Sequence, residues 1–185
     1  IDSWGDFGTT YFLLETFPRA LEGGFPSIQW ILKSRGHYHD DEKNVWIHPD
    51  TLKRVYPDGL TLEERMKKGA VKIGPNVFLG RGAYIEDDCS IRYSDIEKQV
   101  TVCNGASIDH AYVMPYCVIG GFATLVNCAL GLQVLVRSNA EHPTLINGRS
   151  VLGPKLEVPE GVGLIDSRVF PGYRFPPEGG RFESQ

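Results

Sequence analysis

The chain has 185 residues, of which 42% are hydrophobic and 23% charged, and it carries a formal net charge of -4. This composition is that of an ordinary globular protein with one or two structural parts, and the mildly acidic balance excludes the strongly basic surface that nucleic acids bind. Because no apolar run approaches the roughly 20 residues that cross a bilayer and no charged-then-apolar leader opens the chain, we expect a cytoplasmic protein without a membrane partner.

Residues 1–69 are predicted to form a small, partly helical segment followed by a linker. Apolar residues recur at helical spacing in 9–21, and Gly23 and Gly24 end this helix. A second short helix is expected at 61–68, because its T-x-x-E pattern is that of a capping box.

The stretch between these two helices has a weaker pattern. The apolar run at 26–32 suggests a short strand, and the charged sequence HYHDDEKN at 37–44 suggests a polar loop. Residues 50–56 are expected to form a helical turn capped by Asp50.

Internal repetition is the strongest signal in the sequence. From residue 85 to residue 130, aliphatic residues recur in sets of three steps, of six, five and six residues, and each complete set adds up to seventeen. They are Ile85, Ile91, Ile96, Val102, Ile108, Val113, Ile119, Leu125 and Leu130. Residues seventeen apart then stack in three columns, as in a three-sided prism of short parallel strands about 4.8 Å apart. The predicted fold is therefore mainly β, with a left-handed parallel β-helix at 70–136 whose stability comes from stacking of its coils.

After about Leu135 the seventeen-residue register fails. Charged and polar residues stand where the wall of the prism should continue, as at Arg137 and Glu141. We therefore expect residues 137–185 to form an irregular last coil, a loop and an extended tail.

The four cysteines do not form a metal-binding pattern. Cys89, Cys103, Cys117 and Cys128 are spaced 14, 14 and 11 residues apart, without the C-x-x-C pair that clamps zinc. Reduced, buried thiols are expected.

The outside of the predicted prism is unusually poor in charge. Between Gln99 and Val136 the only formal charge is that of Asp109. Seven apolar residues fall at outward positions of the repeat: Met114, Tyr116, Val118, Phe122, Val126, Leu132 and Leu135. An apolar exterior of this extent predicts an interface, either in a homo-oligomer or with another domain. The alternative is a set of scattered surface apolar residues, which needs no partner.

The repeats resemble the hexapeptide-repeat superfamily, and most closely the C-terminal domains of sugar-1-phosphate nucleotidyltransferases. The resemblance covers about half of the chain and includes the segments IEDDCSI, VCNGASIDHAYV and VIGGFATLVNCAL. The opening WGDFGTT, followed by a helix, is similar to the W-x-D-I-G-T segment that ends the catalytic domain in that family. The resemblance implies that Asp6 helps to hold a catalytic magnesium ion, a role that suits a hard oxygen ligand.

The same resemblance implies how the chain contributes to an enzyme. The family's catalytic domain, with its glycine-rich nucleotide loop and catalytic lysine, has no counterpart in these 185 residues. The chain is therefore expected to be the C-terminal region of such an enzyme, whose substrates are a nucleotide and a sugar phosphate. Its β-helix would serve oligomerisation or regulation, or would dock to an upstream catalytic domain. A purely structural assembly subunit without catalysis is a further possibility.

A second resemblance leads to the hexapeptide acyltransferases. These enzymes use a histidine base beside a coenzyme A thioester, and His110 and His142 are the two candidates that the sequence offers. A gamma-class carbonic anhydrase is disfavoured because it needs three converging histidines, and the coils contain only His110. The loop from His37 to Glu42 holds metal-capable side chains, but its run of charge favours a solvated acidic loop.

Overall fold

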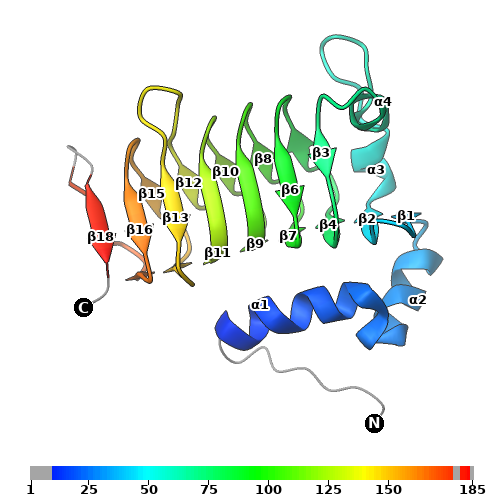
Figure 1. Ribbon diagram of the computed structural model, residues 1–185, viewed down its shortest axis with the longest axis horizontal. Coiled ribbons are helices and arrows are strands. Elements are labelled where there is room, and N and C mark those ends of the chain that lie inside the picture. The colour runs from blue at the N-terminus through cyan, green and yellow to red at the C-terminus, as the bar shows by residue number, and fades with distance from the viewer. Residues whose placement is uncertain (1–9, 177–179, 184–185) are drawn as a thin grey trace.

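The computed structural model describes residues 10–176 and 180–183, with side chains from residue 14 onward. In this part of the chain, short parallel strands wind into a β-helix, and the helices lie at its N-terminal end and along one side (Figure 1). The predicted parallel β-helix with seventeen-residue coils is confirmed. Among the described residues, no helix is long and apolar enough to span a bilayer.

The rear face of the prism is the simplest of its three sides, and its strands lie behind the others in Figure 1. Its strands are β5 (Tyr84–Ile85), β8 (Thr101–Val102), β10 (Val118–Ile119), β12 (Leu135–Val136) and β15 (Glu157–Val158), paired in parallel in this order. The column of Ile85, Val102 and Ile119 is confirmed, because these residues are register partners and are fully buried.

The other two sides are joined through long strands that bend around a shared corner. The front face contains β3 (Lys72–Ile73), β6 (Ser90–Arg92), β13 (Leu145–Asn147), β16 (Gly163–Ile165) and β18 (Arg181–Glu183), together with the first halves of β9 (Ser107–Val113) and β11 (Thr124–Leu130). The arm face contains β4 (Val77–Leu79), β7 (Ser94–Ile96), β14 (Val151–Leu152) and β17 (Arg168–Val169), together with the second halves of β9 and β11.

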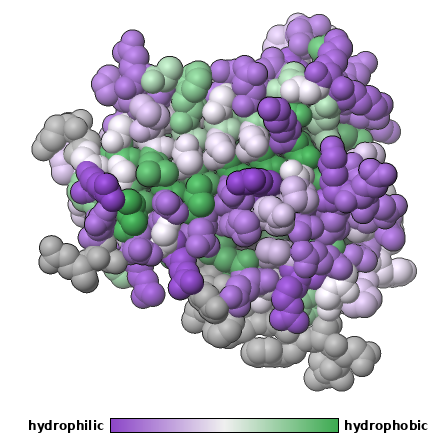
Figure 2. Space-filling view, viewed as in Figure 1, coloured by the Kyte–Doolittle hydropathy of each residue, from purple (hydrophilic) through white to green (hydrophobic). Residues whose placement is uncertain are grey.

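Both remaining aliphatic columns are confirmed on these two faces. On the front face, Ile91 pairs with Ile108 and Ile108 with Leu125. On the arm face, Ile96 pairs with Val113 and Val113 with Leu130. All of these residues are 0 or 1% exposed. The three columns meet inside the prism and form one continuous hydrophobic core. On the outside, the view of Figure 2 shows apolar patches enclosed by hydrophilic side chains.

The ladder of parallel strands continues well beyond residue 136, where we expected an irregular tail. β11 pairs with β13 at a spacing of 21 residues rather than 17, as between Thr124 and Leu145. Residues 137–144 form a loop that leaves the corner between β12 and β13, and the buried hydroxyl of Thr144 closes its base by donating to the carbonyl of Arg137 at 2.7 Å. The insertion broke the periodicity in the sequence without ending the fold.

A helical arm, residues 10–34, lies along the arm face. It consists of α1 (Thr10–Arg19), a π-helical turn η1 (Ala20–Gly24) and α2 (Pro26–Ser34). The helix predicted at 9–21 is confirmed, and Gly23 ends it in the left-handed conformation with φ of 93°. The strand predicted at 26–32 is wrong: this segment is in α2, since proline is favoured in a first helical turn.

A small cap closes the N-terminal end of the prism. The expected polar loop at 37–44 is instead a hairpin of β1 (Tyr38–Asp40) and β2 (Val45–Ile47), and β2 pairs in parallel with β4. In α3 (Pro49–Leu52) the N-cap is His48 rather than Asp50, since the His48 ring accepts from the Asp50 amide. The capping box of α4 (Leu62–Lys67) is confirmed.

One buried arginine fastens this cap to the β-helix. Arg65 of α4 donates to Asp58 at 2.6 Å and to Asp87 in the corner after β5. Its guanidinium also lies over the ring of Tyr56 at 4.2 Å. The cap is thus tied to the first coils by charge-assisted hydrogen bonds as well as by apolar contacts.

The stacked columns predict a large cost for truncating a central rung. Ile108→Ala should lower the free energy of unfolding by about 2–5 kcal/mol, because it leaves a cavity in a fully packed column. Ser107→Ala, at the neighbouring exposed position of the same strand, should change it by less than about 0.5 kcal/mol. Urea unfolding followed by circular dichroism measures both, and equal effects would contradict the stacking model.

Candidate functional site

Polar side chains line the corner that joins the front face to the arm face. At this corner each coil has one residue in the left-handed conformation, with φ between 48° and 63°. These residues are Asn76, Tyr93, His110, Asn127, Arg149 and Asp166. We call them the corner column. Because the coils are stacked, residues far apart in the sequence become neighbours along the outside of the prism.

His110 is the best-defined group of the corner column. Its Nδ1 lies 2.7 Å from Oδ1 of Asp109, and the other carboxylate oxygen of Asp109 lies 2.7 Å from the guanidinium of Arg92. The imidazole also stacks on the ring of Tyr93, with centroids 4.6 Å apart and an angle of 16°. Since an ionised carboxylate only accepts, His110 donates from Nδ1, and Nε2 is the basic nitrogen of the neutral ring.

A small cavity adjoins this histidine beside α1. It has a volume of about 210 Å³ and is lined by Leu14 and Glu15 of α1 and by His110, Asn127 and Arg149 of the corner column. The oriented imidazole, a carboxylate and a guanidinium are thus gathered around one cavity. This arrangement can bind a polar molecule and remove a proton from it.

The structure separates the two histidines that the sequence offered as acyltransferase bases. His142 lies in the exposed loop 137–144, which leaves the corner between the rear and front faces. There its amide donates to the side-chain oxygen of Asn139 at 2.8 Å. His110 lies at a different corner of the prism, so the two do not form one site.

The contacts of Asp109 with Arg92 and of His110 with Tyr93 were not predicted from the sequence, although the sequence contains a signal for them. Arg92 precedes Asp109 by seventeen residues, and Tyr93 precedes His110 by the same number. In a β-helix with this period, such residues are neighbours in adjacent coils. Glu15 and Arg149 could not have been found in this way, because α1 and the insertion at 137–144 lie outside the regular repeat.

The predicted metal ligand is Asp6, and the described structure does not test it. Asp6, the proposed magnesium ligand, lies outside the described residues. In residues 10–176 and 180–183 no group of three or more histidine, cysteine, aspartate or glutamate side chains could hold a metal ion. In the segment from His37 to Glu42, the His39 ring is stacked on Trp46 with centroids 3.7 Å apart. This ring therefore helps to pack the cap.

Six of the seven predicted interface residues gather around the rear face. Val118 and Leu135 are register partners on its outside. Met114, Tyr116 and Leu132 follow the arm-face strands at the corner that leads to it, and Phe122 lies at its other corner. Four of them are exposed by 36 to 48%: Met114, Tyr116, Val118 and Phe122. Val126 instead lies on the front face, paired with Asp109. We call the six residues the rear strip.

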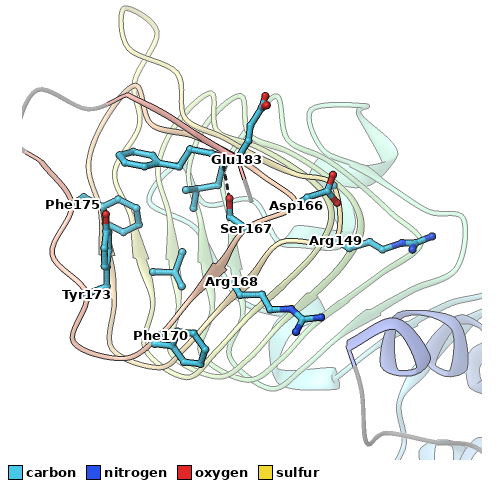
Figure 3. A pocket seen from close by; sticks show the side chains of 12 residues that line it. Arg149, Asp166, Ser167, Arg168, Phe170, Tyr173, Phe175 and Glu183 are labelled. Atoms are coloured by element: carbon cyan, nitrogen blue, oxygen red, sulfur yellow. Dashed lines mark hydrogen bonds between the residues drawn. The ribbon is translucent and has the colours of Figure 1, made fainter. Parts of the chain in front are cut away.

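A larger apolar cavity of about 910 Å³ lies at the C-terminal mouth of the prism (Figure 3). Phe175 stands edge-on to both Tyr173 and Phe182, with ring centroids 5.0 and 5.7 Å apart. Arg149 and Arg168 project on the side away from these rings in Figure 3. The polar groups therefore do not converge on the aromatic wall, and the mouth is a weaker candidate than the His110 corner.

Burial makes the cysteines poor nucleophiles. It raises the pKa of Cys89 to about 12, of Cys117 to about 11 and of Cys128 to about 12, and all four cysteines are free thiols. The expectation of reduced, buried thiols is confirmed for these three, whereas Cys103 is partly exposed. Thiolate is the reactive form, so cysteine chemistry has no support at this site.

This protection predicts the order of thiol modification. With iodoacetamide at pH 8 under native conditions, Cys103 should be alkylated first, and Cys89, Cys117 and Cys128 only on unfolding. Peptide mapping by mass spectrometry measures this order, with protein in urea as the control for full labelling. Rapid labelling of Cys128 in the native protein would show that the core is not closed there.

Comparisons with known protein families and curated proteins found no match. Function must therefore be inferred from the residues of this chain, and the His110 corner and the rear strip are the two features that its geometry offers.

Proposed function

We propose that this chain is the C-terminal region of a sugar-phosphate nucleotidyltransferase, in which the β-helix provides assembly or regulation. The observation that carries the proposal is the position of α1. This helix begins at Thr10, the last residue of the sequence WGDFGTT, and it packs on β9 and β11 of the β-helix. Phe17 of α1 lies against Tyr112 of β9, with ring centroids 6.2 Å apart. The order of motif, helix and β-helix is the order expected for that family.

The proposed reaction joins a nucleoside triphosphate to a sugar 1-phosphate. A phosphate oxygen of the sugar phosphate attacks the α-phosphorus of the nucleotide, and pyrophosphate leaves. Asp6 offers one hard oxygen ligand for magnesium, which would neutralise phosphate charge when bound. The described residues contain no group of three or more metal-ligating side chains, and we assign the other ligands and the nucleotide site to a catalytic domain outside these 185 residues.

Assembly is proposed to occur through the rear strip with a second copy of the chain. The strip combines exposed apolar side chains with a stretch of sequence whose only formal charge is Asp109, which lies on the front face. The arm face, by contrast, is covered by the helical arm of the same chain. Charged residues border the strip: Glu157 is the register partner of Leu135, and Nζ of Lys98 lies 5.7 Å from the centroid of the Tyr116 ring. An apolar patch with a charged rim is typical of a homo-oligomer interface.

The alternative function is acyl transfer from coenzyme A to a sugar amine or hydroxyl. One specific observation favours it: His110 is oriented by Asp109 and Arg92 and faces a cavity. In that reaction Nε2 of His110 would remove the proton of the acceptor as it attacks the thioester carbonyl, the C–S bond would break, and coenzyme A would leave as the thiol with that proton. Calorimetry with coenzyme A separates the two functions, since binding is expected only in the alternative.

The proposed reaction can be tested through pyrophosphate release. The complete gene product should release pyrophosphate from a nucleoside triphosphate and a sugar 1-phosphate in the presence of magnesium. Asp6→Asn should lower kcat by at least about 100-fold, the scale of losing one group that stabilises transition-state charge. Asp2→Asn is the matched control and should retain activity. Full activity of Asp6→Asn would exclude the metal role, and no pyrophosphate release with any substrate pair would contradict the proposed function.

Another prediction concerns assembly. Val118→Asp combined with Leu135→Asp should shift the protein to a lower mass in sedimentation velocity, because it would bury two charges in an apolar contact. Ser107→Asp places the same charge at an exposed outward position of the front face and should leave the mass unchanged. Equal masses for the wild type and the double variant would show that the rear strip is not the interface.

A further inference from the structure

A buried carboxyl group lies between the β-helix and the helical arm. Asp95 is in the middle of β7, where its register partners on the arm face are Phe78 in the coil before and Tyr112 in the coil after. The next residue, Ile96, belongs to an inward aliphatic column. Because side chains alternate along a strand, Asp95 points away from the core. An outward carboxyl group would normally be solvated, yet Asp95 is only 4% exposed.

The helical arm is what covers this carboxyl group. Phe17 contacts Tyr112 in the coil after Asp95, and Glu22 accepts from the side chain of Asn76 at 2.7 Å in the coil before it. The arm must therefore cross the coil of Asp95 between these two contacts. Ala20 and Leu21, in this crossing segment, are 4 and 2% exposed. Figure 1 shows the arm running along this side of the prism, below β7 and β4.

No cation compensates the buried group among the described residues. Oδ1 of Asp95 has no hydrogen-bond partner, and the only charge that acts on this carboxyl is the like charge of Glu97. The phenol of Tyr112 lies 3.5 Å from Glu97. On the arm, Glu22 is bound by Asn76, while Glu15 and Arg19 are exposed. Burial raises the pKa of Asp95 well above its usual range, and the like charge of Glu97 adds to this shift, because an ionised carboxylate without a cation beside it is costly to bury.

We infer that docking of the helical arm on the β-helix is coupled to the binding of one proton by Asp95, so that docking is strongest while Asp95 is protonated. This inference rests on the contacts around Asp95 and does not depend on the proposed function. Below the pKa of an exposed aspartate, the docked and undocked states both hold the proton and docking is strongest. Above it, docking weakens about tenfold for each pH unit until the pH passes the raised pKa of the docked state.

Hydrogen exchange of the arm tests this coupling in the intact chain. After correction for intrinsic rates, protection of the amides in 16–24 should fall in the wild type between pH 5 and pH 7, by up to about tenfold per pH unit, and should level off once the pH passes the raised pKa of Asp95. Amides of β9 and β11 serve as an internal reference, because they lie in the β-helix itself. In Asp95→Asn the protection of the arm should be independent of pH, since the amide side chain does not ionise.

A matched variant controls for the loss of a carboxylate elsewhere. Asp109→Asn removes a carboxylate that is paired with Arg92 and should retain the pH dependence of the wild type. The inference is overturned if arm protection in the wild type is the same at pH 5 and pH 7. It is also overturned if Asp95→Asn keeps the slope of the wild type while the β-helix reference is unchanged.

Discussion

Side chains that point into the prism contact the side chains one coil before and one coil after, and the position of every other group follows from this stacking. A single coil cannot bury its own apolar residues, so each rung depends on its neighbours. Ile108 shows the principle, since Ile91 and Leu125 flank it in adjacent coils. The same repetition sets the spacing of residues on the outside. Asp109 therefore contacts Arg92, and His110 contacts Tyr93, because the members of each pair are one coil apart.

The three outer faces of the prism differ in what covers them. The arm face is covered by a helical arm from the same chain, and the rear face presents apolar side chains. The corner between the front and arm faces carries polar groups. The strands of each face therefore serve as a scaffold, and the function of a face depends on which side chains point outward from it. The two proposals, assembly through the rear strip and proton-coupled docking of the arm, use separate faces and can operate independently.

The β-helix between residues 85 and 130 was predictable because inward positions repeat at a fixed period, which is a strong signal even in one sequence. The coils after residue 136 were not, since the loop 137–144 shifts the register by several residues. The helix α2 was mistaken for a strand because a short apolar run has no decisive period. At the candidate site, His110 was identified from its type and outward position. Asp95 was not, because its burial depends on an arm whose placement the sequence does not give.

The loop 137–144 shows that the surface of this β-helix can change without a change in its core. The corner takes up extra residues, Thr144 closes the loop at its base, and the strands that follow resume their pairing. Residues added at a corner thus change the outer surface that a partner can contact, while the packing of the core is unchanged. A prism of this kind can acquire new surface in small pieces during evolution, one corner at a time, without a matching redesign of the residues inside it.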